Sequence, residues 1–442
     1  RPPSTRLQAI TECPTSDPDC DRPAGRILSL SDIFFDPGDQ GEIDSVYRDL
    51  LPESARYDYT IAIKQKEILA PDLSMQYGLQ SVDGFDGGVL PLANYAKLMD
   101  LILPEDKVAV DGRLREYLES VPEARWMDLF NAKYVITDKV GDEWREGVFF
   151  DRQHQVVLDF DSPTINAGFL PEFLSTELWL ISNAGTGAID ITFVDGEQER
   201  LVPERIGEDL YRVKWSSPSV AAALTLLACE FAQDEPSRCD GQWLIEAATL
   251  VHKQEGVFMP IILGDYRLIH SGDVKIYENL DVFPRAFLVN QWSEQRDVGS
   301  SVDVMADPLF DPEKSAVVIG LADGSTKNEG RGAVEVFDYE QESVGLSVAS
   351  EGGGLLVMTD AYYPGWRATV DGEQSTIYQT DGYFRGVMVP PGQHIVEFRY
   401  EPGSLVVGAA MTAFGIFFLL ILLVVGLMNR KVSAIETPNL AG

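Results

Sequence analysis

The apolar stretch LVVGAAMTAFGIFFLLILLVVGLM, at residues 405–428, decides the architecture of this chain. No residue in it carries a charge. A helix of this length spans roughly 36 Å at about 1.5 Å per residue, which is enough to cross the hydrocarbon core of a bilayer with some tilt. The run is too long for a core strand and too uniformly apolar for an amphipathic surface helix. We therefore predict one transmembrane helix here.

The residues that flank this helix predict its direction. Arg430 and Lys431 follow the apolar run, and Lys and Arg are enriched on the cytoplasmic side of membranes. We expect the tail at 429–442 in the cytoplasm and the bulk of the chain outside a bacterial cytoplasmic membrane. The lipid bilayer is then one partner. Other membrane helices or subunits are further expected partners, because small residues allow close helix packing: Gly408, Ala409, Ala410 and Gly415.

Composition narrows the classes of partner. The chain has 442 residues, of which 45% are hydrophobic, so packed cores are expected rather than general disorder. The formal net charge is −35, which argues against nucleic acid as a partner and against broad docking on anionic lipid headgroups. The acidic balance fits a solvated outer surface.

The four cysteines fall into two pairs that are close in sequence. Cys13 lies near Cys20, and Cys229 lies near Cys239. Neither pair has zinc-ligand spacing and no His lies beside either, so a metal site is not expected. Two local disulfides are typical of an extracytoplasmic compartment, with free buried thiols as the alternative. Because the chain opens on Arg1 without a signal sequence, we expect it to be a piece of a longer polypeptide.

The predicted fold class is α+β and mostly β. The expected order is a linker at 1–26, a mixed α/β domain at 27–147, a jelly-roll-like β-sandwich at 148–263, a connecting β region at 264–333, a membrane-proximal β module at 334–403, the membrane helix at 405–428 and the tail at 429–442.

Local patterns predict the elements inside these domains. Residues 93–103, 113–121 and 125–132 are predicted helices, and residues 61–64 are predicted as a short strand. Helix and strand compete over residues 220–229, where we favour a strand. Asp371-Gly372 is typical of a two-residue hairpin turn. Around it, strands are predicted at 334–339, 344–349, 355–359, 366–370, 384–389 and 395–400.

At this last module the sequence resembles a known family. MTDAYYPGWRATVDGEQ at 358–374 and YFRGVMVPPGQHIVEFRYEPGSLVVG at 383–408, followed by the apolar helix, resemble the C-terminal end of the YfhO-like bacterial membrane proteins. YGLQSVDGFDGGVLPLANYAKL at 77–98 has the same character. The resemblance implies the large outer region and last span of a GT-C-type glycosyltransferase-like protein. It implies catalytic carboxylates on membrane-segment loops that this chain does not contain, so no catalytic residue is assigned.

Two groups of residues are candidate sites. Tyr362, Tyr363 and Trp366 form an aromatic group that is suited to glycan stacking or to the membrane interface, with core packing as the alternative. Asp83 and Asp86, in DGFDGG, are a candidate cation site, although a tight glycine turn is the favoured interpretation. No cofactor and no metal are expected.

These observations predict a membrane-anchored extracytoplasmic portion that binds an acceptor, or acts as a scaffold, for cell-envelope glycosyl transfer. Catalysis is then located elsewhere, and this chain alone is not catalytic. The alternative is a non-catalytic accessory subunit of a larger membrane complex. A self-contained hydrolase is disfavoured, because the four histidines are far apart in the sequence and no nucleophile motif is present.

Overall fold

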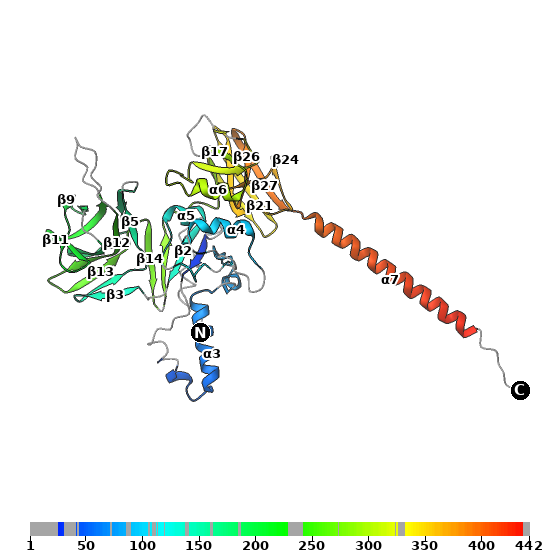
Figure 1. The fold of residues 1–442 in the computed structure, drawn as a ribbon, viewed down its shortest axis with the longest axis horizontal. Helices are drawn as coiled ribbons and strands as arrows, with labels where there is room; N and C mark the ends of the chain where they lie inside the picture. The colour runs from blue at the N-terminus through cyan, green and yellow to red at the C-terminus, as the bar shows by residue number, and fades with distance from the viewer. Residues whose placement is uncertain are drawn as a thin grey trace.

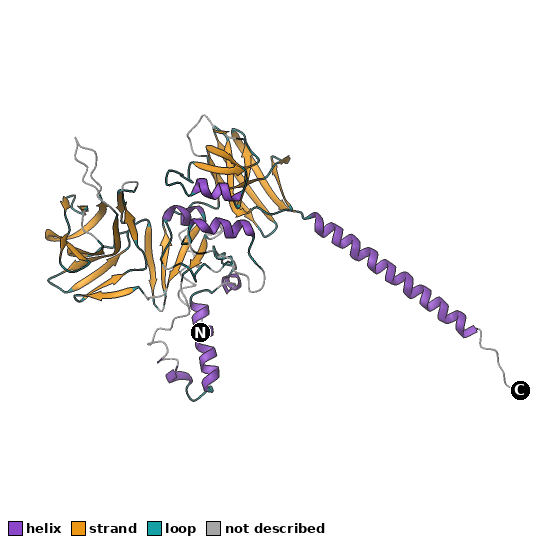
Figure 2. Ribbon diagram, in the orientation of Figure 1, coloured by secondary structure: helices purple, strands orange, loops and turns teal. Residues whose placement is uncertain are grey.

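The computed structural model of this chain has three folded units, and a long helix extends away from them (Figure 1). Strands outnumber helices over the described residues and dominate the second and third units, whereas most of the helices lie in the first unit (Figure 2). The mostly β fold class with one C-terminal apolar helix is therefore confirmed. The residues that the structure describes are 25–30, 41, 44–70, 73–84, 90–104, 107, 112, 114–118, 120–137, 141–159, 162–183, 187–228, 242–272, 274–322, 324–325 and 332–435.

The first unit is a four-stranded sheet covered by short helices. Its strand order is β1 (Arg26–Ser29), β2 (Ala132–Thr137), β15 (Lys275–Asn279) and β14 (Tyr266–Ser271), and β1 and β2 run parallel. Part of the predicted connecting region therefore completes this sheet. Its helical elements are α3 (Glu53–Glu67), η1 (Leu73–Tyr77), α4 (Ala93–Leu98), η2 (Met99–Leu101) and α5 (Ala124–Leu129).

Two predicted elements of this unit are wrong. Residues 61–64 lie inside α3, not in a strand. This segment is free of Gly and Pro, and Glu53 at its start and Lys64 and Lys66 at its end complement the helix dipole. The predicted helix at 113–121 is also wrong over its described part, because residues 114–118 form turns. The helices predicted at 93–103 and 125–132 are present as α4 with η2 and as α5.

The second unit is a nine-stranded sheet joined to a short hairpin. One long strand, β11 (Leu210–Leu227), pairs with β7 through its first part and with β8 and β6 through its second. It includes most of the stretch at 220–229 and confirms a strand there. The other strands are β3 (Asp142–Arg145), β4 (Val148–Asp151), β5 (Val156–Leu158), β6 (Thr164–Asn166), β7 (Leu174–Ser182), β8 (Ala188–Phe193), β9 (Gln198–Leu201), β10 (Glu204–Arg205), β12 (Trp243–His252) and β13 (Val257–Ile261).

The third unit is a sandwich of a seven-stranded and a five-stranded sheet. The larger sheet has the order β16 (Ala286–Val289), β22 (Gly354–Ala361), β26 (Phe384–Val389), β25 (Tyr378–Thr380), β18 (Ser315–Ile319), β17 (Gln291–Gln295) and β19 (Gly324–Ser325), with α6 (Val298–Met305) beside it. The smaller has the order β20 (Ala333–Tyr339), β21 (Ser343–Ser350), β27 (Gly392–Tyr400), β23 (Trp366–Val370) and β24 (Glu373–Ser375). Strands lie at all six predicted positions. Asp371 and Gly372 form the expected hairpin turn, both with positive φ.

Strand β22 shows why the first and third units are one body. Leu355 and Val357 point into a core shared with α4, η2 and α5 of the first unit. Leu356 and Met358 point into the core between the two sheets of the third unit. Because successive side chains of a strand face opposite ways, this strand is buried on both faces and fixes the two units to each other.

Helix α7 (Gly403–Ile435) contains the predicted membrane span. Its segment Gly403–Leu427 has mean hydropathy 2.7 and packs against no part of the described body. Apolar side chains on all sides of a helix that nothing covers are suited to lipid or to other membrane helices. The four cysteines lie outside the described residues, so their pairing stays a prediction.

A buried carboxyl group makes the stability of the third unit depend on pH. Asp381, in the turn between β25 and β26, is 1% exposed, and its Oδ1 accepts a hydrogen bond from Val317 N at 3.0 Å. Burial raises the pKa of Asp381 to about 7. The pKa of an Asp in an unfolded chain is about 3.9, so Asp381 ionises at a lower pH in the unfolded state than in the folded state. The stability that neutral Asp381 provides is therefore complete below about pH 4 and is lost as pH rises toward 7.

We expect Asp381→Asn to remove this loss. Asn keeps an oxygen acceptor for Val317 N and tolerates the positive φ of this position, but it does not ionise. The melting temperature of the variant, relative to wild type, should rise between about pH 4 and about pH 7. The matched control is Asp371→Asn, in the other Asp-Gly turn, where a hydrogen bond with His394 lowers the pKa of the aspartate. A difference between Asp381→Asn and wild type that does not change with pH would contradict this account.

Candidate functional site

One carboxylate near the end of β22 collects three guanidinium groups. Arg26 Nη2 and Arg385 Nη2 each lie 2.9 Å from Asp360, and Arg285 Nη1 lies 3.4 Å from it. The Tyr339 hydroxyl donates to Asp360 Oδ2 at 3.0 Å. Arg26 comes from β1 of the first unit, whereas Asp360 and the other two arginines come from the third. The cluster is thus a polar contact between two units that also share an apolar core.

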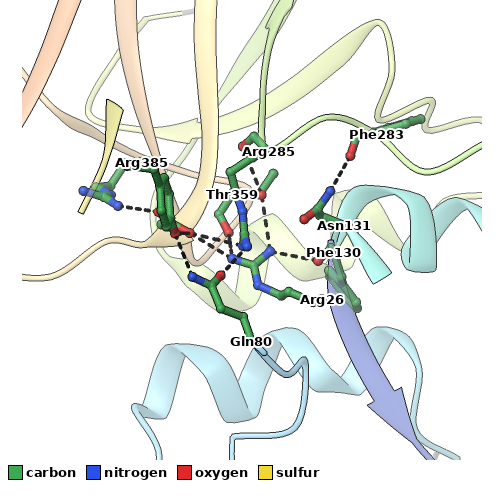
Figure 3. A network of polar contacts seen from close by, with 10 residues as sticks. Arg26, Gln80, Phe130, Asn131, Phe283, Arg285, Thr359 and Arg385 are labelled. Atoms are coloured by element: carbon green, nitrogen blue, oxygen red, sulfur yellow. Dashed lines mark hydrogen bonds and ion pairs between the residues drawn. The ribbon is translucent and has the colours of Figure 1, made fainter. Parts of the chain in front are cut away.

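Neighbouring backbone groups hold Arg26 in this position. Its Nη1 donates to Phe130 O at 2.8 Å, beyond the end of α5, and its Nη2 donates to Thr359 O. Thr359 follows Leu355 and Val357 on the face of β22 that meets the first unit. Figure 3 shows Arg26, Arg285 and Gln80 converging beside Thr359 from separate elements. A polar group on a strand buried on both faces needs such partners.

Gln80 and Arg285 extend the network. Arg285 donates through Nη2 to Gln80 Oε1, and Gln80 Nε2 donates to the Tyr339 hydroxyl at 3.3 Å. Gln80 directly precedes the Ser-Val-Asp-Gly segment, whose Ser81 bridges to β1. The network therefore ties this loop to the third unit as well.

The positive charges in this cluster outnumber the negative one. Arg26, Arg285 and Arg385 surround a single carboxylate, and their side chains are only 14%, 3% and 2% exposed. Burial first, and then the neighbouring Arg285, lowers the pKa of Arg26 to about 10, although Asp360 acts in the opposite direction. Burial likewise lowers the pKa of Arg385. The cluster remains cationic at neutral pH.

The cluster forms part of the wall of a cavity of about 770 Å³. This cavity lies between the first and third units, and its opposite wall comes from the loop at 79–84 and from α4. Its aromatic and polar lining includes Arg26, Gln80, Asp83, Tyr95, Asp360, Tyr363, Trp366, Tyr383 and Arg385. A volume of this size, apolar over much of its wall with a few convergent polar groups, is typical of a small-molecule site.

Glycine at position 84 shapes the far wall. A Cβ there would lie 2.6 Å from the ring of Tyr95, so only glycine lets the loop approach that ring. Tyr95 in turn donates to Val82 O at 2.9 Å and packs edge-on against Tyr383 at 5.8 Å between ring centroids. The DGFDGG segment therefore has a packing role at its described end.

The structure brings two of the three predicted aromatic residues to this cavity. Tyr363 and Trp366 line it, and together with Tyr362 they also line a neighbouring groove of about 510 Å³. The guanidinium of Arg385 lies 3.9 Å from the centroid of the Trp366 ring, a cation–π contact. Trp366 and Tyr363 also pack on Tyr400, two residues before the break that leads into α7. The aromatic group thus lies between two hollows at the membrane-proximal end.

The candidate cation site is only partly described. Asp83 lies in the cavity wall and its Oδ2 accepts a hydrogen bond from Leu114 N at 3.4 Å, whereas Asp86 lies outside the described residues. Among the described residues no group of three or more His, Cys, Asp or Glu is placed to hold a metal ion. A cation at Asp83 and Asp86 stays a prediction.

Sequence reasoning missed the arginine cluster. Its members are far apart in the sequence: 334 residues separate Arg26 from Asp360. One signal was present, because Arg26 and Arg385 each stand at or near the start of an otherwise apolar strand. A charged residue inside a strand that is buried elsewhere needs a partner, although the sequence does not say which.

The comparisons with known proteins agree with the resemblance noted in the sequence. Residues 325–412 match the family model described as Bacterial membrane protein YfhO. The matched range contains Tyr339, Asp360 and Arg385 but neither Arg26 nor Arg285. No curated protein matches the chain. The C-terminal part of the chain is thus YfhO-like, and the described residues contain one helix that is long and apolar enough to cross a membrane.

Solved structures give weaker likenesses. Two cryo-EM structures of arabinofuranosyltransferase AftD from Mycobacteria, one of a mutant, align with 64% and 69% of this chain and with 25% and 24% of their own, at 11% and 9% identity and TM-scores of 0.17 and 0.15. Oxalate decarboxylase from Bacillus subtilis aligns with 59% of this chain and 74% of its own, at 10% identity and a TM-score of 0.12. This chain spans about a quarter of the AftD chains. At such TM-scores the alignments establish neither a shared overall fold nor a shared activity.

Proposed function

We propose that this chain is the extracytoplasmic portion of a YfhO-like, glycosyltransferase-like protein and that it binds a carbohydrate acceptor for envelope glycosyl transfer. The catalytic groups then lie outside these residues. The observation that carries the proposal is the aromatic cavity of about 770 Å³ between the first and third units, next to the membrane-proximal end of the chain. Aromatic rings that stack on sugar faces, with hydrogen-bonding groups beside them, are the chemistry a saccharide needs.

The connection to α7 supports a role close to the membrane. Glu401 N donates to Gly365 O at 2.7 Å, and a Cβ on Gly365, where φ is +110°, would lie 2.9 Å from the Tyr400 ring. This glycine allows the aromatic turn to pack directly against the strand that enters the helix. The packing favours a cavity held at a constant distance from the bilayer.

An accessory subunit of a larger membrane complex is the second candidate function. Helix α7 supports it, since small residues lie along its uncovered first half, at Gly408, Ala409, Ala410 and Gly415. Such residues allow another membrane helix to approach closely. Under this alternative the cavity binds no saccharide, so glycan binding discriminates between the two functions.

We predict that the full chain in detergent binds neutral oligosaccharides from bacterial envelope polymers, and that Tyr363→Ala weakens this binding about tenfold. Tyr363 is 46% exposed and lines both hollows, and losing a stacked ring costs about 1 kcal/mol or more. Trp366→Ala should weaken binding at least as much, because it also removes the support of Arg385. Isothermal titration calorimetry measures both effects.

The matched control is Tyr57→Ala on α3, a tyrosine that is 62% exposed and does not line the cavity. It should bind like wild type. If no oligosaccharide binds to the wild-type chain, or if all three variants bind equally well, the cavity is not the acceptor site and the accessory-subunit function gains support.

We further propose that Arg430 and Lys431 lie in the cytoplasm and the three folded units outside, because basic residues flank the span at its C-terminal end. Protease added to intact cells that express the chain should then degrade the units and spare an epitope tag fused after residue 442. A tag that is degraded while the folded units are protected would reverse this topology.

A further inference from the structure

The arginine cluster contains more positive charge than its own chain neutralises. Three guanidinium groups face the single carboxylate of Asp360, so the cluster has an excess of about two positive charges within an interior that is largely shielded from water. Uncompensated buried charge is strongly unfavourable, and natural sites avoid it unless a partner is supplied. The depressed pKa of Arg26, which burial and the nearby Arg285 cause, agrees with this excess.

The hydrogen-bond donors are in excess as well. Among the described residues, no acceptor lies within hydrogen-bonding distance of Arg385 Nε, Arg385 Nη1 or Arg285 Nε, all of which are buried. The Trp366 and Phe398 rings partly stabilise the Arg385 charge, at 3.9 and 5.2 Å, but they accept no strong hydrogen bond. A buried donor without an acceptor costs free energy, which an anionic ligand would recover.

Two of the three arginines lie where a ligand can meet them. Arg26 and Arg385 line the cavity of about 770 Å³, whereas Arg285 does not line it. Guanidinium forks bind phosphate oxygens through paired hydrogen bonds that match in geometry as well as in charge. Asp83 lines the same cavity, and its negative charge disfavours an anion near the loop at 79–84. An anion is therefore favoured only in the part of the cavity next to Arg26 and Arg385.

We propose that Arg26 and Arg385 form a phosphate subsite of this cavity, and that the ligand presents a phosphate monoester or diester to them. This inference rests on the proposed function in one respect, since it places the phosphate on the saccharide that the aromatic wall binds. The chain has a formal charge of −35, so its long-range field repels anions. Binding therefore depends on contacts inside the cavity.

The test uses the full chain in nonionic detergent with glucose 1-phosphate as probe and glucose as its neutral counterpart. Calorimetry should show tighter binding of glucose 1-phosphate. Arg26→Gln should weaken this binding about tenfold or more and lower the ratio of glucose 1-phosphate affinity to glucose affinity, whereas Arg26→Lys, which keeps the charge, should recover part of that ratio. The control is Arg200→Gln, whose arginine forms an exposed ion pair with Asp190 in the second unit. It should bind like wild type.

Asp360→Asn provides a second test, in which the variant should gain more thermal stability from the ligand than wild type does. This change removes the carboxylate that competes with a ligand phosphate for the three arginines. The variant should melt at a lower temperature than wild type without ligand, and added glucose 1-phosphate should raise its melting temperature more than it raises that of wild type. If phosphate raises the melting temperature of neither protein, the cluster is purely structural and the inference is wrong.

A lipid headgroup is another source of the same chemistry, and nanodiscs distinguish the two sources. If phosphatidylglycerol in a phosphatidylcholine nanodisc abolishes glucose 1-phosphate binding, the phosphate belongs to a lipid. If it does not, the phosphate belongs to a soluble saccharide, as we expect. Oligosaccharide binding without any gain from phosphate contradicts the subsite and leaves the proposed function intact. Phosphate binding without oligosaccharide binding contradicts the proposed function and leaves the subsite intact.

Discussion

The carboxylate of Asp360 is the contact on which the arrangement of this protein depends. It receives Arg26 from the first β-strand, Arg285 from the loop before β16 and Arg385 from β26, the strand paired with β22. Buried ion pairs of this kind are sensitive to the loss of one member, which typically costs about 3–5 kcal/mol because the remaining charges lose their partner. The contact therefore specifies which surfaces of the first and third units meet.

The apolar core and the polar cluster have complementary roles. Burial of Leu355, Val357 and Phe384 against α4 and α5 supplies a non-directional driving force for joining the units. The arginine cluster adds directional hydrogen bonds and ion pairs at the edge of that core, next to the cavity. Trp366 links the two ends of this arrangement, since its ring supports Arg385 on one side and packs on Tyr400 beside the membrane helix on the other. A ligand in the cavity would thus contact Trp366, which also packs on the strand that leads into α7.

Local sequence patterns predicted those parts of the structure that local physics determines. The charge-free run predicted the long apolar helix. The alternation of apolar and polar residues, together with the Asp371-Gly372 turn, predicted six strands of the third unit. Alternation failed at residues 61–64, where a short apolar run is compatible with either period and the longer uninterrupted context favours α3. The cavity was found only in part. Tyr363 and Trp366 stood out because aromatic residues cluster there in sequence, whereas Arg26, Gln80 and Asp360 meet only through tertiary pairing of distant strands.

The central claim is that one cluster both joins the two units and forms the cavity wall. Hydrogen–deuterium exchange of the full chain, compared between wild type and Asp360→Ala, measures this directly. The account predicts faster exchange in β1, in the loop at 79–84 and in β22 and β26 of the variant, with unchanged exchange in β7 and β12 of the second unit. Faster exchange confined to β22 and β26, with β1 and the loop as protected as in wild type, would contradict it.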